Sequence, residues 1–213
     1  ACPPLEDIHA AGADVFGDLQ RGGGMVTFFP ELNRKRPPVG MVDFVSHALC
    51  PIVHAADDLS VMETLEAVPH ITASARGIIG DKPYRIGPST IAMRHNPYGQ
   101  RTIPNPDGQR ICMADTDPRH GAAFGAAYTL GLACALAPAG IAVWTPSELY
   151  GPRGLSGPLK EAVTSLARLS QEPVHFAGIE DGIGTLQVGE HELRVNLTAD
   201  PCSDLAAFGW RAG

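Results

Sequence analysis

Short apolar runs alternate with helical stretches along most of the chain, and polar residues follow each run. The apolar runs, which we predict to be strands, cover residues 25–29, 48–53, 84–88 and 141–145. Strands that alternate with helices are typical of βαβ units, in which the strands are parallel and the crossovers right-handed. The sequence therefore predicts an α/β domain whose polar clusters lie at the carboxyl ends of its strands. Ligands bind there in (β/α)8 barrels and in open α/β sheets.

Helical spacing of apolar residues predicts the segments that connect these strands. Ser60 and Glu63 have the spacing of a capping box, which marks the start of the helix after the second strand. The predicted helices cover residues 5–19, 39–47, 61–78, 121–137 and 158–171. Neither GxGxxG nor GxxxxGK[ST] follows any predicted strand, so the pattern does not favour the nucleotide-binding forms of this architecture.

The pattern changes near residue 174. Residues 174–176, 185–188 and 192–197 alternate between apolar and polar side chains, and glycine-containing turns separate them. A period of two is typical of antiparallel strands that bury one face. We therefore predict a small antiparallel β appendage after the last helix.

Composition excludes several partners. The chain of 213 residues has a formal net charge of -7, which gives it no positive field for a nucleic-acid backbone. Glycine and proline interrupt the longest apolar stretch, residues 122–143, so we expect no membrane span. The cysteines form no CxxC pair, and we expect free thiols in a reducing, cytoplasmic compartment. They are Cys2, Cys50, Cys112, Cys134 and Cys202.

Two glutamates lie just after predicted strands. Glu31 follows the first strand and Glu148 follows the fourth. Two carboxylates on one face of a barrel can act as acid and base when their surroundings separate their pKa values. The alternative is that each glutamate pairs with a nearby arginine, Arg34 or Arg153, and has no chemical role.

The densest polar cluster follows the second predicted strand. His54 can shuttle a proton near neutral pH, and Asp57 can orient it or contact a polyol. Asp58 has a simpler alternative role at the start of the next helix. A metal held by Glu31, His54 and Asp57 is conceivable, but the HxxD spacing is too common to support one, so we predict no metal.

Further candidates follow the third and fourth strands. Arg94 can hold a carboxylate or stabilise an oxyanion, and Asn96 lies close to it in the sequence. Ser89 lacks the GxSxG setting of a nucleophile. Trp144 can stack on a sugar ring or simply pack at the end of the sheet.

Taken in order, several of these motifs resemble the D-apionate lactonase family. The resemblance covers most of residues 4–170 and rests on residues 29–34, 50–65, 86–89, 94–97, 117–119 and 124–131. It implies a TIM barrel like those of glycoside hydrolases, lying between an N-terminal domain and a C-terminal β domain. The implied reaction is hydrolysis of D-apionolactone to D-apionate in apiose catabolism.

The resemblance also implies how the chain divides. We expect residues 1–172 to form the C-terminal half of a (β/α)8 TIM barrel, because the motifs match the later strands. Residues 173–213 would begin the C-terminal β domain. The sequence starts without Met and enters a helical pattern at once, so we expect a part of a longer enzyme that is inactive alone.

For this reaction we hypothesise three catalytic residues, Glu31, His54 and Glu148, with no cofactor. The hypothesised substrate-binding residues are Asn33, Asp57, Arg94, Asn96 and Trp144. The expected partner is a small sugar lactone, and the oligomeric state stays open. Two alternatives also stay open: a glycoside hydrolase that uses paired carboxylates, and a barrel that binds carbohydrate without catalysis.

Overall fold

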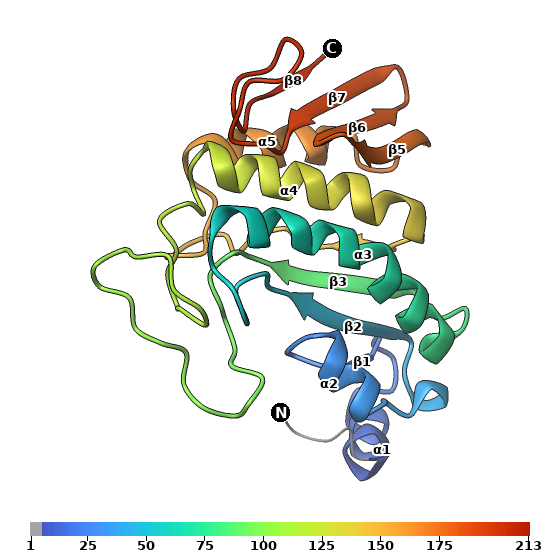
Figure 1. Cartoon of the computed structure of the whole chain (residues 1–213). Coiled ribbons are helices and arrows are strands. Elements are labelled where there is room, and N and C mark those ends of the chain that lie inside the picture. Colours follow the sequence, from blue (N-terminus) through green and yellow to red (C-terminus); the bar gives the residue numbers. More distant parts are fainter. Residues whose placement is uncertain (1–5) are drawn as a thin grey trace.

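The computed structural model describes residues 6–213, which contain two four-stranded sheets on opposite sides of a pair of helices. In Figure 1 the parallel sheet lies below helices α3 and α4, and the antiparallel sheet lies above them. The parallel strands are β1 (Gly22–Gly24), β2 (Phe44–Leu49), β3 (Tyr84–Ser89) and β4 (Val143–Trp144). They pair in sequence order, each parallel to the next, which confirms the predicted α/β architecture.

Because the four strands are parallel, their carboxyl ends all lie at one edge of the sheet, and a helix follows each strand. These helices are α2 (Phe29–Arg34), α3 (Asp58–Ile79), α4 (Ala123–Leu136) and α5 (Gly157–Arg168). Helix α1 (Glu6–Val15) precedes the sheet, and no residue of this described helix is buried. Short 3-10 helices cover Val39–Met41 and Ala137–Ala139. None of the helices in residues 6–213 is long and apolar enough to cross a membrane.

Helix α4 is buried almost throughout, because other elements cover it on several sides. Small residues allow this close packing. A Cβ atom on Gly131 would lie 2.6 Å from a methyl carbon of Leu65 on α3 and 3.0 Å from one of Leu197. The glycine therefore lets α3 and the end of the antiparallel sheet approach the same turn of α4.

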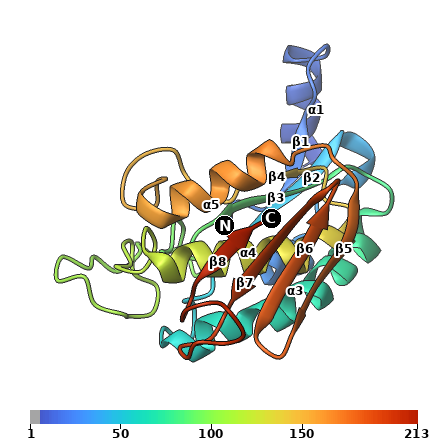
Figure 2. The ribbon, with the colours of Figure 1, turned by 90° about the horizontal axis from the view of Figure 1, so that it is seen from above.

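The antiparallel sheet contains β5 (Val174–Glu180), β6 (Ile183–Val188), β7 (His191–Asn196) and β8 (Trp210–Ala212), in that order. Figure 2 shows it lying over α4, with α5 beside it. One face of β6 and β7 packs into the core through Leu186, Val188, Leu193 and Val195. The predicted antiparallel appendage is confirmed, and β8 is an additional strand.

Two strand predictions were wrong in position. The first strand is Gly22–Gly24, and residues 29–34, which overlap the predicted strand 25–29, form helix α2. Pro30 and Glu31 in its first turn and Arg34 in its last suit helix ends. The second strand is Phe44–Leu49 rather than 48–53. Val45 and residues 47–49 are buried in it, and the later apolar residues form a loop wall.

Two predicted helices and one predicted helix cap also need correction. The predicted helix 39–47 is reduced to the 3-10 turn Val39–Met41, since the strand begins at Phe44. The capping box of Ser60 and Glu63 does not form: Asp57 is the N-cap of α3 and accepts a hydrogen bond from the Ser60 backbone N–H at 2.9 Å. The first helix ends at Val15 instead of residue 19. Its predicted first residue, Leu5, lies outside the described residues.

Candidate functional site

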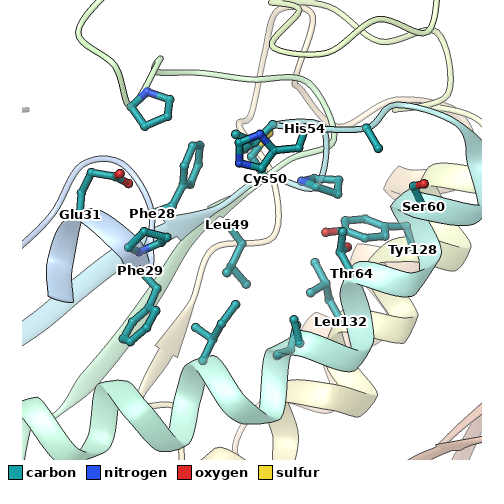
Figure 3. A pocket seen from close by; sticks show the side chains of 18 of the residues that line it. Phe28, Phe29, Glu31, Leu49, Cys50, His54, Ser60, Thr64, Tyr128 and Leu132 are labelled. Atoms are coloured by element: carbon teal, nitrogen blue, oxygen red, sulfur yellow. The ribbon is translucent and has the colours of Figure 1, made fainter. Parts of the chain in front are cut away.

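A cavity of about 390 Å³ lies at the carboxyl ends of β1 and β2, between helices α2, α3 and α4. Figure 3 shows Glu31 on one side of it and His54 at its upper rim. Both residues line the cavity, so the structure brings together two of the three hypothesised catalytic residues. Glu31 comes from α2, which follows β1, and His54 comes from the loop between β2 and α3.

Glu31 is the buried charged residue of this cavity. Its side chain is 11% exposed, and its Oε1 accepts a hydrogen bond from Nη1 of Arg34 at 3.1 Å. Its Oε2 is also buried and has no hydrogen-bond partner among the described residues. A buried carboxylate oxygen without a partner is costly, so this atom has an unmet need for a hydrogen-bond donor.

His54 is exposed, and its loop is held at both ends. At the helix end, the Asp57 carboxylate caps α3 through Ser60, and this hydrogen bond lowers the pKa of Asp57. At the strand end, the carbonyl oxygen of Ile52 accepts from the Met113 backbone N–H at 2.8 Å. These two contacts fix the loop and leave the imidazole facing the cavity and solvent.

Most of the cavity wall is apolar. Side chains of α3 and α4 form its floor, and aromatic rings form part of its sides. The apolar lining includes Phe28, Phe29, Leu49, Val53, Val68, Ile71 and Leu132. Such a wall excludes water, which strengthens electrostatic interactions with the few polar groups present.

Two protonated groups lie among these apolar residues. Burial raises the pKa of the Cys50 thiol to about 12, and the thiol donates to the backbone oxygen of Ile91 at 3.4 Å. Burial also raises the pKa of Tyr128. Both groups stay protonated at neutral pH, so neither is an effective nucleophile or base.

The long loop before α4 covers one side of the cavity with Pro97 and Tyr98. Asn96 shapes this loop from within: it donates to the Arg101 backbone oxygen at 3.1 Å and accepts from the Tyr98 N–H at 2.9 Å. Asn96 itself is buried and does not line the cavity. Its observed contacts position Tyr98 rather than reach the cavity.

Three other hypothesised binding residues also lie off the cavity. Asp57 caps α3, and Asn33 accepts a hydrogen bond from Arg36 at 2.9 Å on the exposed side of α2. Arg94 is exposed and donates to the backbone oxygen of Val26 at 2.9 Å. Arg94 thus joins the segments that follow β3 and β1, at the same edge of the sheet.

The last residue of β4 and the residues that follow this strand form polar contacts away from the cavity. Oε1 of Glu148 accepts from Nε of Arg153 at 3.1 Å, and Nη1 of Arg153 donates to the Asp115 backbone oxygen at 2.9 Å. The indole of Trp144 donates to the hydroxyl of Ser89 at 3.1 Å. Neither Glu148 nor Trp144 lines the cavity that holds Glu31 and His54.

Sequence reasoning missed several residues of the cavity. The sequence suggests Arg34 only as an ion-pair partner of Glu31, and the structure shows that it also lines the cavity. Tyr98 and Tyr128 come from a distant loop and from α4, and no local motif identifies them. Their contribution depends on how α2, α3 and α4 pack. No three His, Cys, Asp or Glu side chains in the described part of the chain are placed to share a metal ion.

Two comparisons with known proteins, one with a family profile and one with a single relative, point to the same family. The sequence profile of the family described as "D-apionate lactonase, TIM barrel domain" matches residues 1–177. A D-apionate lactonase of Brucella anthropi is 57% identical over 155 residues, which are 73% of this chain and 26% of that protein. The chain thus spans about a quarter of the length of this relative.

Among solved structures, a glucosidase from Croceicoccus marinus aligns with 88% of this chain and 41% of its own chain. The TM-score is 0.47, and the sequence identity is 13%. The profile match covers most of the chain and agrees with its alternating parallel strands and helices. The chain belongs to the D-apionate lactonase family.

Proposed function

We propose that this protein opens a sugar lactone, D-apionolactone, to D-apionate in the catabolism of apiose. The observation that carries the proposal is the carboxylate of Glu31: it is buried, one of its oxygens lacks a partner among the described residues, and it shares a cavity with His54. Membership of the D-apionate lactonase family, and a relative of that name, support the choice of substrate.

Ester hydrolysis needs an activated water molecule and protonation of the leaving oxygen. In the proposed reaction, Oε2 of Glu31 takes a proton from water as the water oxygen bonds to the lactone carbonyl carbon. The tetrahedral intermediate collapses, its bond to the ring oxygen breaks, and the imidazolium of His54 protonates that oxygen. Glu31 then returns its proton to His54 through solvent. The net change is addition of one water molecule to the lactone.

The tetrahedral intermediate carries a negative oxygen that needs stabilisation. Arg34 lines the cavity and is the nearest permanent cation to Glu31. We propose Arg34 for this role, because Glu31 is protonated at this stage and no longer competes for that cation; Arg94 lies off the cavity and donates to Val26, so it is not placed to share the role. The apolar wall around Phe28 and Leu49 suits the C–H face of a sugar ring.

The chain is proposed to supply the C-terminal half of a (β/α)8 barrel over residues 1–172 and the start of a C-terminal β domain over residues 173–213. The sequential parallel order of β1 to β4 and the greater length of the relative support this division. Activity would then require the longer cytoplasmic enzyme. There, Glu148, Trp144, Asn33, Asp57 and Asn96 would act at or behind the barrel mouth, without nucleic acid or membrane as partner.

Substitution of Glu31 by Gln tests the proposal. In the longer enzyme, titration of the acid released from D-apionolactone at constant pH should show at least about a hundredfold loss of turnover, because general-base catalysis contributes roughly that much. Glu63→Gln, on the exposed side of α3, is the matched control and should keep full activity. Circular dichroism checks that both variants fold. A folded Glu31→Gln variant with unchanged turnover would refute the assignment.

A further inference from the structure

The charges around the cavity are unevenly exposed. Of the described residues that line it, Glu31 is the acidic residue and Arg34 the basic one, and His54 adds an imidazole. The Arg34 side chain is 70% exposed, so water and salt screen its charge. Oε2 of Glu31 is instead buried within the apolar wall. The cavity therefore presents its negative atom in an apolar setting and its positive group in water.

We propose that this arrangement selects ligands by charge: the cavity binds a neutral ring that carries hydroxyl groups and rejects the carboxylate that ring opening creates. The proposal rests on the lactone hydrolysis described above and adds how the same site distinguishes substrate from product. A ring hydroxyl donates a hydrogen bond to Oε2 of Glu31 and satisfies that atom. A carboxylate has no proton to donate at neutral pH and places a second negative charge beside the first.

Arg34 would attract the acid, because a guanidinium is a good partner for a carboxylate. However, its Nη1 already donates to Oε1 of Glu31, and its side chain lies mainly in solvent. An acid bound by Arg34 would also share that cation with Glu31. The repulsion from the buried Glu31 acts beside the apolar wall and is less screened than the attraction to the exposed Arg34.

Charge selection has a direct consequence for turnover. Each ring opening converts a ligand that the cavity holds into one that it rejects. The acid therefore leaves the cavity without competing strongly with the next lactone, and accumulated product slows the reaction little.

Calorimetric titration with two probes tests this inference, on the protein in the longest form in which it is expressed. The probes are a 1,4-anhydropentitol, which is a neutral five-membered ring that cannot be hydrolysed, and a linear pentonate, which is the acid. The unmodified protein should bind the ring more tightly than the acid. Glu31→Gln should bind the acid at least about tenfold more tightly than the unmodified protein does, because the repulsion is gone. Glu63→Gln should change neither affinity.

Two results would overturn the inference: tighter binding of the pentonate than of the ring by the unmodified protein, or no gain in pentonate affinity in folded Glu31→Gln. If Glu31→Gln does not fold, the ranking of the two probes by the unmodified protein decides alone. Lactone turnover is measured separately. A protein that ranks the probes as expected but leaves D-apionolactone intact refutes the proposed function and keeps the charge selection. A protein that hydrolyses D-apionolactone but binds the pentonate more tightly than the ring refutes the charge selection and keeps the proposed function.

Discussion

The hydroxyl of Tyr84 on β3 donates to Nε2 of His47 on β2 across 2.6 Å, inside the core. Nδ1 of His47 lies 2.9 Å from the backbone oxygen of Ala48, so Nδ1 carries the ring proton and Nε2 is the acceptor. Both side chains are fully buried. The pair joins two neighbouring strands on the face that α2 and α3 cover, where Phe29 and Arg76 contact the two rings.

Removing the Tyr84 hydroxyl should destabilise the protein. Tyr84→Phe keeps the ring but leaves Nε2 of His47 buried without a donor, which lowers the free energy of unfolding by about 1–3 kcal/mol. Urea denaturation followed by circular dichroism measures the change. Tyr98 is 60% exposed, so Tyr98→Phe should lose less than about 0.5 kcal/mol. Equal losses in the two variants would contradict the assigned hydrogen bond.

His47 should also make stability depend on pH. Burial lowers its pKa from 6.5 to about 4. The unfolded chain therefore binds a proton at His47 below pH 6.5, whereas the folded chain does so only below about pH 4. The contribution of His47 is fully present above pH 6.5 and falls by up to about 3 kcal/mol as the pH drops to 4. Urea midpoints at several pH values should show a smaller loss in His47→Gln than in the unmodified protein. Parallel curves would exclude His47 as the cause.

The same substitution should have opposite effects at two helical glycines. Gly131→Ala places a methyl group 2.6 Å from Leu65 and 3.0 Å from Leu197, so the packing must shift and stability falls by about 1–3 kcal/mol. Gly77 on α3 is exposed and has open space where a Cβ would lie. Gly77→Ala should therefore raise stability by up to about 1 kcal/mol through better helix propensity. Thermal denaturation of both variants checks the signs, and a stabilised Gly131→Ala would refute the close packing of α4.

Arg119 should be essential for the loop before α4. It donates from Nε and Nη2 to Asp117 at 2.9 and 2.7 Å and from Nη1 to Asp58 at 2.8 Å. The side chain of Asp117 is 0% exposed, so Arg119→Gln leaves a buried carboxylate without its cation and costs about 3–5 kcal/mol. Arg110→Gln removes only a partner of Asp58 that is 54% exposed and should cost less than about 1 kcal/mol. Urea denaturation should show a clearly larger loss in the free energy of unfolding for Arg119→Gln than for Arg110→Gln. Similar losses would mean that another group compensates the buried charge of Asp117.

The elements best predicted from sequence are those in which several local signals agree. Helix α3 has helical periodicity, a polar N-terminus and a terminal glycine, and the prediction of residues 61–78 falls inside the observed Asp58–Ile79. The second strand was displaced because the apolar run continues past its end. Cys50 and Val53 are apolar since they line the cavity, and sequence alone does not separate a cavity wall from a strand.

The site was predictable only where chain order implies proximity. Glu31 and His54 follow adjacent parallel strands, so their closeness could be expected from the topology. Glu148 follows β4, two strands away from β2, and its position depends on the curvature of the sheet and on its contact with Arg153. Tyr128 reaches the cavity because α4 packs against α3, a tertiary contact that no spacing along the chain reveals.

The burial of α4 between the two sheets bears on how the protein unfolds. Buried residues of both sheets, such as Val45 and Tyr84 on one side and Leu186 and Val195 on the other, belong to one hydrophobic cluster that includes α4. Separation of the antiparallel sheet would expose an apolar helix with no polar face to turn toward water. The two sheets should therefore unfold together, in one transition rather than in two successive steps.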